Sequence, residues 1–151
     1  MKTRVIVSAC LLGENCKYNG GNNRNDAVLA LRRYFDVIAV CPECFGNLPV
    51  PRPPSEIKNG RVFSKDGKDV TQAFLTGAEQ TLYIAREHNC PAAVLKERSP
   101  SCGYGVIYDG SFTGKLCSGN GVTAQLLADN GIAVFGENRV NKLIELYADE
   151  G

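Results

Sequence analysis

The stretch RVIVSAC, residues 4–10, is a short Val/Ile-rich run that ends at a cysteine. Apolar residues at consecutive positions predict a strand that is buried on both faces, as in a parallel sheet. Similar runs recur at residues 36–40 (DVIAV), 91–97 (PAAVLKE) and 132–137 (IAVFGE). Helical patterns separate these runs, so the sequence predicts parallel βαβ units.

The segments between the predicted strands supply the crossover helices. These segments are residues 26–34, 71–88, 122–130 and 138–150. Asp69 or Thr71 can cap the second helix, Gly131 can end the third, and Asn138 can cap the last. Residues 60–70 predict a small hairpin that turns at Asp66-Gly67. We expect residues 1–151 to form a single domain, a three-layer α/β/α (Rossmann-like) fold with about four to five mainly parallel strands and this hairpin as an insertion.

Composition narrows the class of protein further. The 151 residues carry a formal net charge of +1, so the charge balance does not favour binding to nucleic acid. The N-terminal stretch MKTRVIVSAC loosely fits a lipoprotein cleavage site, but its apolar core spans only residues 5–7. No later apolar run has the roughly 18 residues that a membrane span needs. We therefore expect a cytoplasmic protein without a membrane partner.

Seven cysteines in a cytoplasmic chain are not expected to form disulfides. Cys10, Cys41 and Cys102 lie just beyond predicted strand ends, next to loop residues, rather than within strands or helices. Because ligands of parallel α/β sheets bind at the carboxyl ends of the strands, these three thiols are expected to face one cleft.

The residues alone leave several chemistries open for these thiols. A structural zinc site needs four ligands, with Cys16 or Cys44 as candidates to complete it. A thiol-redox pair at Cys41 and Cys44 would open a helix, which the prolines that follow are expected to prevent. An iron–sulfur cluster is also held by cysteine thiolates gathered from loops.

Five sequence blocks resemble domain-of-unknown-function family 523 (DUF523), which includes thiouracil desulfidases. The blocks are VSACLLGENCKYNG, CPECFGNLPVPRPPSE, GKDVTQAFLTGA, LKERSPSCGYGVIYDGSFTG and GNGVTAQLLADNGIAVFGE. They occur in order from Val7 to Glu137 and so cover nearly the whole chain.

The resemblance implies a [4Fe-4S] cluster bound by Cys10, Cys41 and Cys102, with one iron left open. It implies non-redox removal of sulfur from a small thiocarbonyl compound, such as 2-thiouracil or another thiolated base or thioamide. Glu43 and Ser101 match the acidic residue and the serine described beside the cluster in the family. The alternative is a zinc- or thiol-based binding module without desulfidase activity.

Other residues near these blocks have simpler expected roles. Cys16 is an additional candidate ligand, and three further cysteines are assigned to packing: Cys44, Cys90 and Cys117. Arg52 is expected to pair with Glu56, although Glu43 could also pair with Arg52 or Arg98. Lys96 and Glu97, which flank the end of the third strand, are expected to form surface ion pairs.

Overall fold

The structure is a computed structural model that describes residues 2–148. Four parallel strands form the central sheet in the order β2–β1–β5–β8, as the sequence predicts. Their bounds are β1 (Thr3–Ser8), β2 (Phe35–Val40), β5 (Ala92–Leu95) and β8 (Ala133–Gly136). Within the described residues, no helix is long and apolar enough to cross a membrane.

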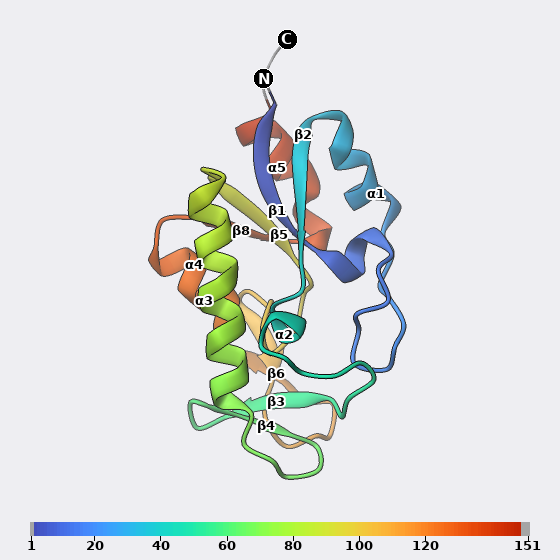
Figure 1. The fold of residues 1–151 in the computed structure, drawn as a ribbon, viewed down its shortest axis with the longest axis vertical. Helices are drawn as coiled ribbons and strands as arrows, with labels where there is room; N and C mark the ends of the chain where they lie inside the picture. Colours follow the sequence, from blue (N-terminus) through green and yellow to red (C-terminus); the bar gives the residue numbers. More distant parts are fainter. Residues whose placement is uncertain (1, 149–151) are drawn as a thin grey trace.

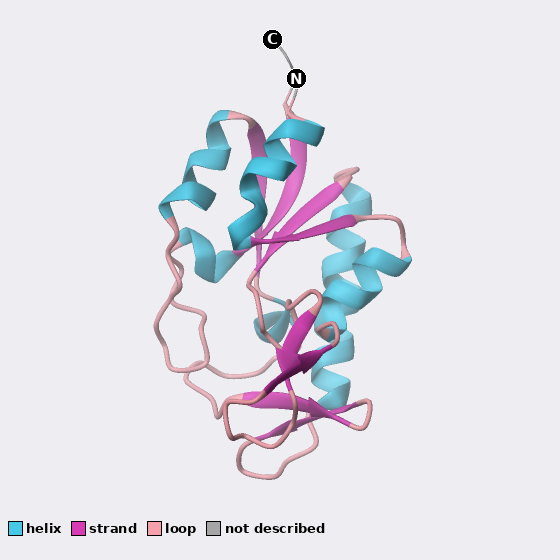
Figure 2. Ribbon diagram, turned by 180° about the vertical axis from the view of Figure 1, so that it is seen from behind, coloured by secondary structure: helices cyan, strands magenta, loops and turns pink. Residues whose placement is uncertain are grey.

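Helices cover both faces of the sheet and complete the three-layer arrangement (Figures 1 and 2). On one face lie α1 (Asp26–Leu29), which a 3-10 turn continues to Arg33, and α5 (Val140–Tyr147). On the other face lie α3 (Thr71–Glu87) and α4 (Val122–Asp129). The fold class is therefore the predicted α/β/α arrangement.

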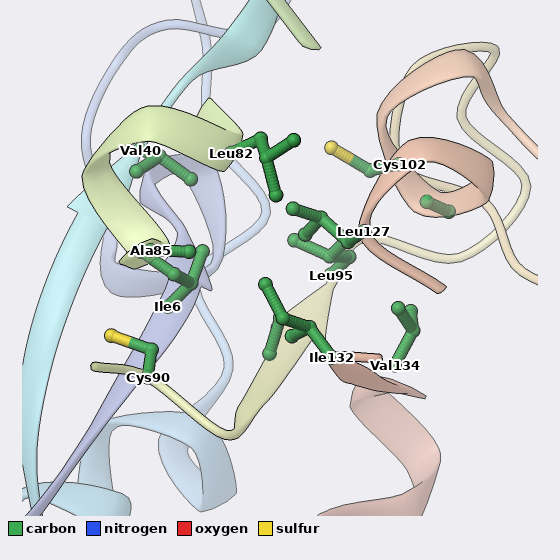
Figure 3. Close-up of a cluster of buried hydrophobic side chains, with 12 residues drawn as sticks. Ile6, Val40, Leu82, Ala85, Cys90, Leu95, Cys102, Leu127, Ile132 and Val134 are labelled. Carbon is green, nitrogen blue, oxygen red and sulfur yellow. The ribbon is translucent and has the colours of Figure 1, made fainter. Parts of the chain in front are cut away.

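Alternate residues of the buried strands supply the two cores. In β1, Val5 and Val7 pack against α1 and α5, whereas Ile6 packs against α3 and α4. All three side chains are fully buried, and burying each one stabilises the fold by about 1.5–3 kcal/mol. Figure 3 shows Cys102 and Cys90 at opposite ends of the core that contains Ile6.

Two hairpins lie beyond the carboxyl ends of the sheet strands (Figures 1 and 2). They are β3 (Ser55–Lys58) with β4 (Arg61–Ser64), and β6 (Val106–Tyr108) with β7 (Leu116–Ser118). Glu56 connects them, because its Oε1 accepts hydrogen bonds from the backbone N–H groups of Gly110 (3.0 Å) and Phe112 (3.2 Å). The hairpins are therefore held over the edge of the sheet where the strand-end cysteines lie.

A short helix, α2 (Pro42–Phe45), follows β2 directly, and the prediction that prolines exclude a helix here is wrong. Pro42 occupies the first turn, where proline's fixed φ fits a helix and its missing N–H leaves no bond unmade. The helix ends at Phe45, with Gly46 as its C-cap, before the later prolines begin. Cys41 is the N-cap residue of α2 and sits between the sheet and this helix.

Three local predictions have different outcomes. The predicted turn at Asp66-Gly67 is confirmed, because an antiparallel bridge joins Phe63 to Asp69 around it. A further turn at Asn59-Gly60, both with positive φ, joins β3 to β4 and was not predicted. Asp69 does accept a hydrogen bond from the backbone N–H of Thr71 (3.0 Å) at the start of α3. The prediction that Asn138 caps the last helix is wrong, because α5 begins at Val140 and the Asn138 amide donates to Glu97 (2.9 Å) instead.

Candidate active site at the carboxyl edge of the sheet

A cavity of about 680 Å³ opens between the carboxyl edge of the sheet and the two hairpins. Its inner wall includes the strand-end residues Ser8, Cys10, Cys41, Lys96, Ser99, Cys102 and Glu137. Its outer wall includes Pro54, Ser55 and Glu56 from the first hairpin region, and Tyr108, Phe112 and Gly114 from the second. The cavity is thus built from segments far apart in the sequence.

Cys10, Cys41 and Cys102 converge on this cavity. Cys10 lies in the 3-10 turn that follows β1, and Cys41 directly follows β2. Since the two strands pair in parallel register up to Ser8 and Val40, their following residues emerge side by side. Cys102 arrives from the loop after β5, and its thiol is close enough to Cys10 and Cys41 for their charges to act on it.

The loop that carries Cys102 is fixed by local hydrogen bonds. The hydroxyl of Ser99 accepts from the backbone N–H groups of Ser101 (3.1 Å) and Cys102 (3.0 Å). The carbonyl of Ser101 accepts from the N–H of Thr123 (2.8 Å) in the first turn of α4. A Cβ on Gly121 would lie 2.5 Å from the carbonyl carbon of Ser101, so only glycine allows this approach.

The three thiols differ in their tendency to ionise. The pKa of Cys41 is lowered to about 5, chiefly by a hydrogen bond from Cys16, with further contributions from Cys44 and Arg52. Burial raises the pKa of Cys102 to about 12 and also raises that of Cys10. The same hydrogen bond raises the pKa of Cys16, so the two thiols titrate as a pair.

The other cysteines have varied surroundings. Cys16 lines the cavity, whereas Cys44 contacts Cys41 but is not part of the lining. Cys90 is buried in the core beneath α3, as predicted. The packing prediction is wrong for Cys117, which is exposed on the short strand β7, where the side chains of all three residues are exposed.

Glu43 faces the cavity and forms an ion pair with Arg52, with 3.3 Å between Oε1 and Nε. The Arg52 side chain is only 5% exposed and also donates to the carbonyls of Cys16 (3.0 Å) and Pro49 (3.1 Å). Burial raises the pKa of Glu43, and the guanidinium opposes that rise. The predicted pairing of Arg52 with Glu56 is wrong, because Glu56 holds the second hairpin instead.

The structure separates the two serines of the SPSC block. Ser101 is fully buried, and its hydroxyl lies 2.7 Å from that of Thr123 rather than in the cavity lining. Ser99 does line the cavity. Sequence reasoning assigned a role to Ser101 and none to Ser99, because the sequence alone cannot tell which serine of a proline-containing turn faces the core.

Sequence reasoning also missed a second ion pair. Lys96 Nζ lies 3.1 Å from Oε2 of Glu137, and both side chains line the cavity. They are 28% and 13% exposed, so the expected surface pairing is wrong for Lys96. The signal was present in the sequence, because each residue directly follows a buried strand and neighbouring parallel strands end at the same edge.

Cysteine side chains are the candidate metal ligands of this cavity. Among residues 2–148, no group of three or more Cys, His, Asp or Glu side chains is arranged to hold one metal ion. A structural zinc site requires four ligands around one ion. Iron–sulfur clusters are held by cysteine thiolates gathered from separate segments, and Cys10, Cys41 and Cys102 line one cavity from three such segments.

Comparisons with known proteins agree with this site. A solved structure described as the [4Fe-4S]-dependent thiouracil desulfidase TudS (DUF523Vcz) is 42% identical, with a TM-score of 0.90 over 95% of this chain and 97% of the other. The uncharacterized protein YbbK of Bacillus subtilis (strain 168) is 39% identical over 150 residues, covering 93% of this chain and 99% of YbbK. These likenesses confirm the resemblance to DUF523. The sequence model of the 2-thiouracil desulfurase family matches residues 5–139, and the chain belongs to that family.

Proposed function

We propose that this chain removes sulfur from a thiocarbonyl substrate such as 2-thiouracil by non-redox hydrolysis. Water supplies the oxygen of the new carbonyl group, and the sulfur leaves with the two protons of water as hydrogen sulfide. No electrons are exchanged, so no external oxidant or reductant is required. Family membership and the likeness to a thiouracil desulfidase support this proposal.

We assign Cys10, Cys41 and Cys102 as the residues that hold a [4Fe-4S] cluster. When bound through three protein ligands, such a cluster supplies an open iron that acts as a Lewis acid towards a soft sulfur atom. The lowered pKa of Cys41 favours the thiolate form, in which a cysteine binds metal. Cys16, which also faces the cavity, stays an additional candidate ligand.

Glu43 is the proposed proton carrier of the site. Its carboxyl group lines the cavity, and burial raises its pKa towards the range in which a carboxyl both takes and returns a proton. It can accept a proton from the attacking water and return it to the departing sulfur. Arg52 fixes the orientation of this carboxylate through the 3.3 Å contact.

Ser99 is the better placed of the two serines for contact with substrate, because it lines the cavity. The proton-transfer role that the family resemblance implies for Ser101 would require its hydroxyl to leave Thr123 and the core. We therefore propose that Ser99 contacts the substrate and that Ser101 holds the loop beside Cys102.

The observation that carries the proposal is the convergence of three strand-end thiols and one buried carboxyl on a single cavity. The test is to prepare the protein without oxygen, to quantify iron and sulfide, and to measure sulfide release from 2-thiouracil. We expect about four irons per chain, with iron lost after substitution of Cys10, Cys41 or Cys102 by serine.

Glu43→Gln and Cys44→Ser are the informative companion variants. Glu43→Gln is expected to keep its iron and to lose about 10²–10⁴-fold in turnover, the range typical of a general acid–base residue. Cys44→Ser is the matched control for the cysteine series, since Cys44 touches Cys41 without lining the cavity. A loaded protein that releases no sulfide from any thiolated base would contradict the proposed activity.

A thiol-redox function is the second candidate, and two observations favour it. Cys41 is the N-cap of α2 with a pKa of about 5, and Cys44 follows three residues later with its pKa raised to about 11. This pattern is typical of a Cys-X-X-Cys redox pair. Replacing Cys44 by serine separates the candidates, because a redox pair loses its activity without Cys44 and the hydrolytic reaction does not need it.

A further inference from the structure

The cavity contains a second ion pair to which the proposed reaction assigns no role. Lys96 directly follows β5, and Glu137 directly follows β8. Leu95 and Gly136 are register partners in these adjacent parallel strands, so the next residue of each strand emerges beside the other. The sheet itself therefore places an ammonium group and a carboxylate next to each other on the cavity wall.

Both groups are held firmly. Lys96 Nζ contacts Oε2 of Glu137 at 3.1 Å and donates to the carbonyl of Glu97 at 3.1 Å. Oε1 of Glu137 accepts from the backbone N–H of Glu97 at 2.6 Å. The backbone N–H of Lys96 donates to the hydroxyl of Ser8 at 3.0 Å. With the backbone and both side chains tied down, the pair is preorganised before any ligand arrives.

The Lys96 ammonium group and the Glu137 carboxylate can each form further hydrogen bonds. A lysine ammonium group has three donors, and within residues 2–148 two of these have the partners just described. A carboxylate has about four acceptor positions, of which contacts to Lys96 and Glu97 use two. One donor of Lys96 and at least one acceptor position of Glu137 therefore have no partner among residues 2–148, on side chains that both line the cavity.

This pair is also near the proposed cluster ligands. The charges of Lys96 and Glu137 both act on the thiol of Cys10, in opposite directions. The Glu43–Arg52 pair lines the same cavity, but Arg52 acts on Cys41 and Glu43 acts on Cys102. The reacting sulfur of a substrate would lie near the thiols, and Lys96 and Glu137 would meet another edge of the same small molecule.

We propose that Lys96 and Glu137 recognise the amide edge of the substrate ring, in which an N–H adjoins a carbonyl group. Lys96 donates to the ring carbonyl oxygen, and Glu137 accepts from the neighbouring ring N–H. In 2-thiouracil this N–H lies between the carbonyl and the thiocarbonyl carbon. The inference rests on the proposed function and narrows the substrate class to oxo-thio pyrimidine bases, as opposed to thioamides in general.

Loss of one hydrogen bond to a charged group costs about 10–100-fold in binding. We therefore expect the loaded wild-type enzyme to prefer 2-thiouracil over pyrimidine-2-thione, which lacks the ring carbonyl, by about 10–100-fold in kcat/KM. In Lys96→Met this preference should fall towards one, with the loss on 2-thiouracil appearing mainly in KM and with iron content unchanged. Lys142→Met, which removes the exposed pair with Glu145, is the matched control and should keep the preference.

Glu137→Gln tests the other half of the pair with a different substrate. The wild-type enzyme should discriminate against 3-methyl-2-thiouracil, which lacks the ring N–H, and Glu137→Gln should reduce that discrimination. If Lys96→Met and Glu137→Gln keep the wild-type substrate ratios and only lower stability, the pair is structural and the inference is overturned.

A binding measurement separates this inference from the proposed function. Uracil, the expected product, carries the same amide edge but no sulfur, so its binding needs no turnover. Titration of the cluster-free protein with uracil, followed by ligand-observed NMR, should show binding that Lys96→Met weakens about tenfold or more. Absence of uracil binding, or equal binding by the variant, would contradict the inference even if sulfide release is found. Conversely, Lys96-dependent uracil binding without sulfide release would support the recognition and contradict only the activity.

Discussion

Arg52 joins three segments of the site through a single side chain. Its guanidinium contacts Glu43 in α2, the Cys16 carbonyl in the loop after β1, and the Pro49 carbonyl in the proline-rich loop. Because the side chain is only 5% exposed, water cannot replace these contacts easily. The residue is therefore a positioning element for the carboxylate and for both loops.

Arg52→Met is expected to destabilise the protein by about 3 kcal/mol, the cost typical of leaving one partner of a buried ion pair alone. Chemical denaturation of the cluster-free protein measures this free energy of unfolding. Lys142→Met removes an exposed pair between side chains that are 47% and 69% exposed, and should change stability by less than about 0.5 kcal/mol. Similar effects of the two substitutions would show that Arg52 is not a central contact.

The hydroxyl pair of Ser101 and Thr123 makes a separate prediction. Ser101→Ala leaves the buried Thr123 hydroxyl without its 2.7 Å partner, and should cost about 1–3 kcal/mol in stability. Thr123→Val should cost a similar amount, and the double variant should cost less than the sum, because the second substitution removes an already unpaired group. If Ser101→Ala instead abolishes sulfide release while stability is unchanged, Ser101 acts in the reaction as the family resemblance implies.

At the scale of elements, α2 and α3 meet through two glycines. A Cβ on Gly77 in α3 would lie 1.8 Å from the carbonyl oxygen of Pro42, and one on Gly46 would lie 2.1 Å from that of Ala73. Such backbone contacts leave no room for a side chain. The close crossing fixes α2, and with it Cys41 and Glu43, relative to the sheet.

Gly77→Ala should therefore destabilise the protein, although alanine normally stabilises a helix interior by about 1 kcal/mol relative to glycine. We expect a net loss of at least about 1–3 kcal/mol from overpacking and a reduced iron content after reconstitution. Gln80→Ala, at an exposed position of α3, is the matched control and should be close to neutral. Urea denaturation and iron quantification check both variants, and a stabilised Gly77→Ala would show that the crossing is looser than the structure indicates.

The elements also show what sequence reasoning can and cannot reach. The buried strands and α3 were predictable because Val/Ile runs and the face formed by Phe74 and Ala78 report burial directly. Helix α2 was not predictable from the sequence. Proline is compatible with the first turn of a helix, where Pro42 lies, but composition does not reveal that position. Convergence of the strand-end thiols followed from topology. Topology does not tell which of Ser99 and Ser101 faces the cavity, because tertiary packing against α4 decides it.

At the scale of the whole molecule, the proposed ligands connect three segments that are far apart in the sequence and meet at one cavity. Cys10 and Cys41 follow adjacent strands, whereas Cys102 lies in a loop anchored on α4. A group that binds all three thiols in the folded chain, and not in the unfolded one, must stabilise the fold by mass action. It should also restrain the loops around the cavity.

Cluster loading is therefore expected to raise the free energy of unfolding by about 2 kcal/mol or more, which for a chain of this size corresponds to roughly 5 °C in Tm. Anaerobic calorimetry of loaded and cluster-free protein measures the shift. Cys44→Ser should show the same shift in Tm as wild type, whereas Cys102→Ser should show none.

Hydrogen exchange should slow on cluster loading in residues 9–16, 41–54 and 98–105, the loops that carry the ligands and their neighbours. A shift of equal size in Cys102→Ser, or protection confined to the first two loops, would mean that Cys102 is not a ligand and that the third segment reaches the cavity for another reason.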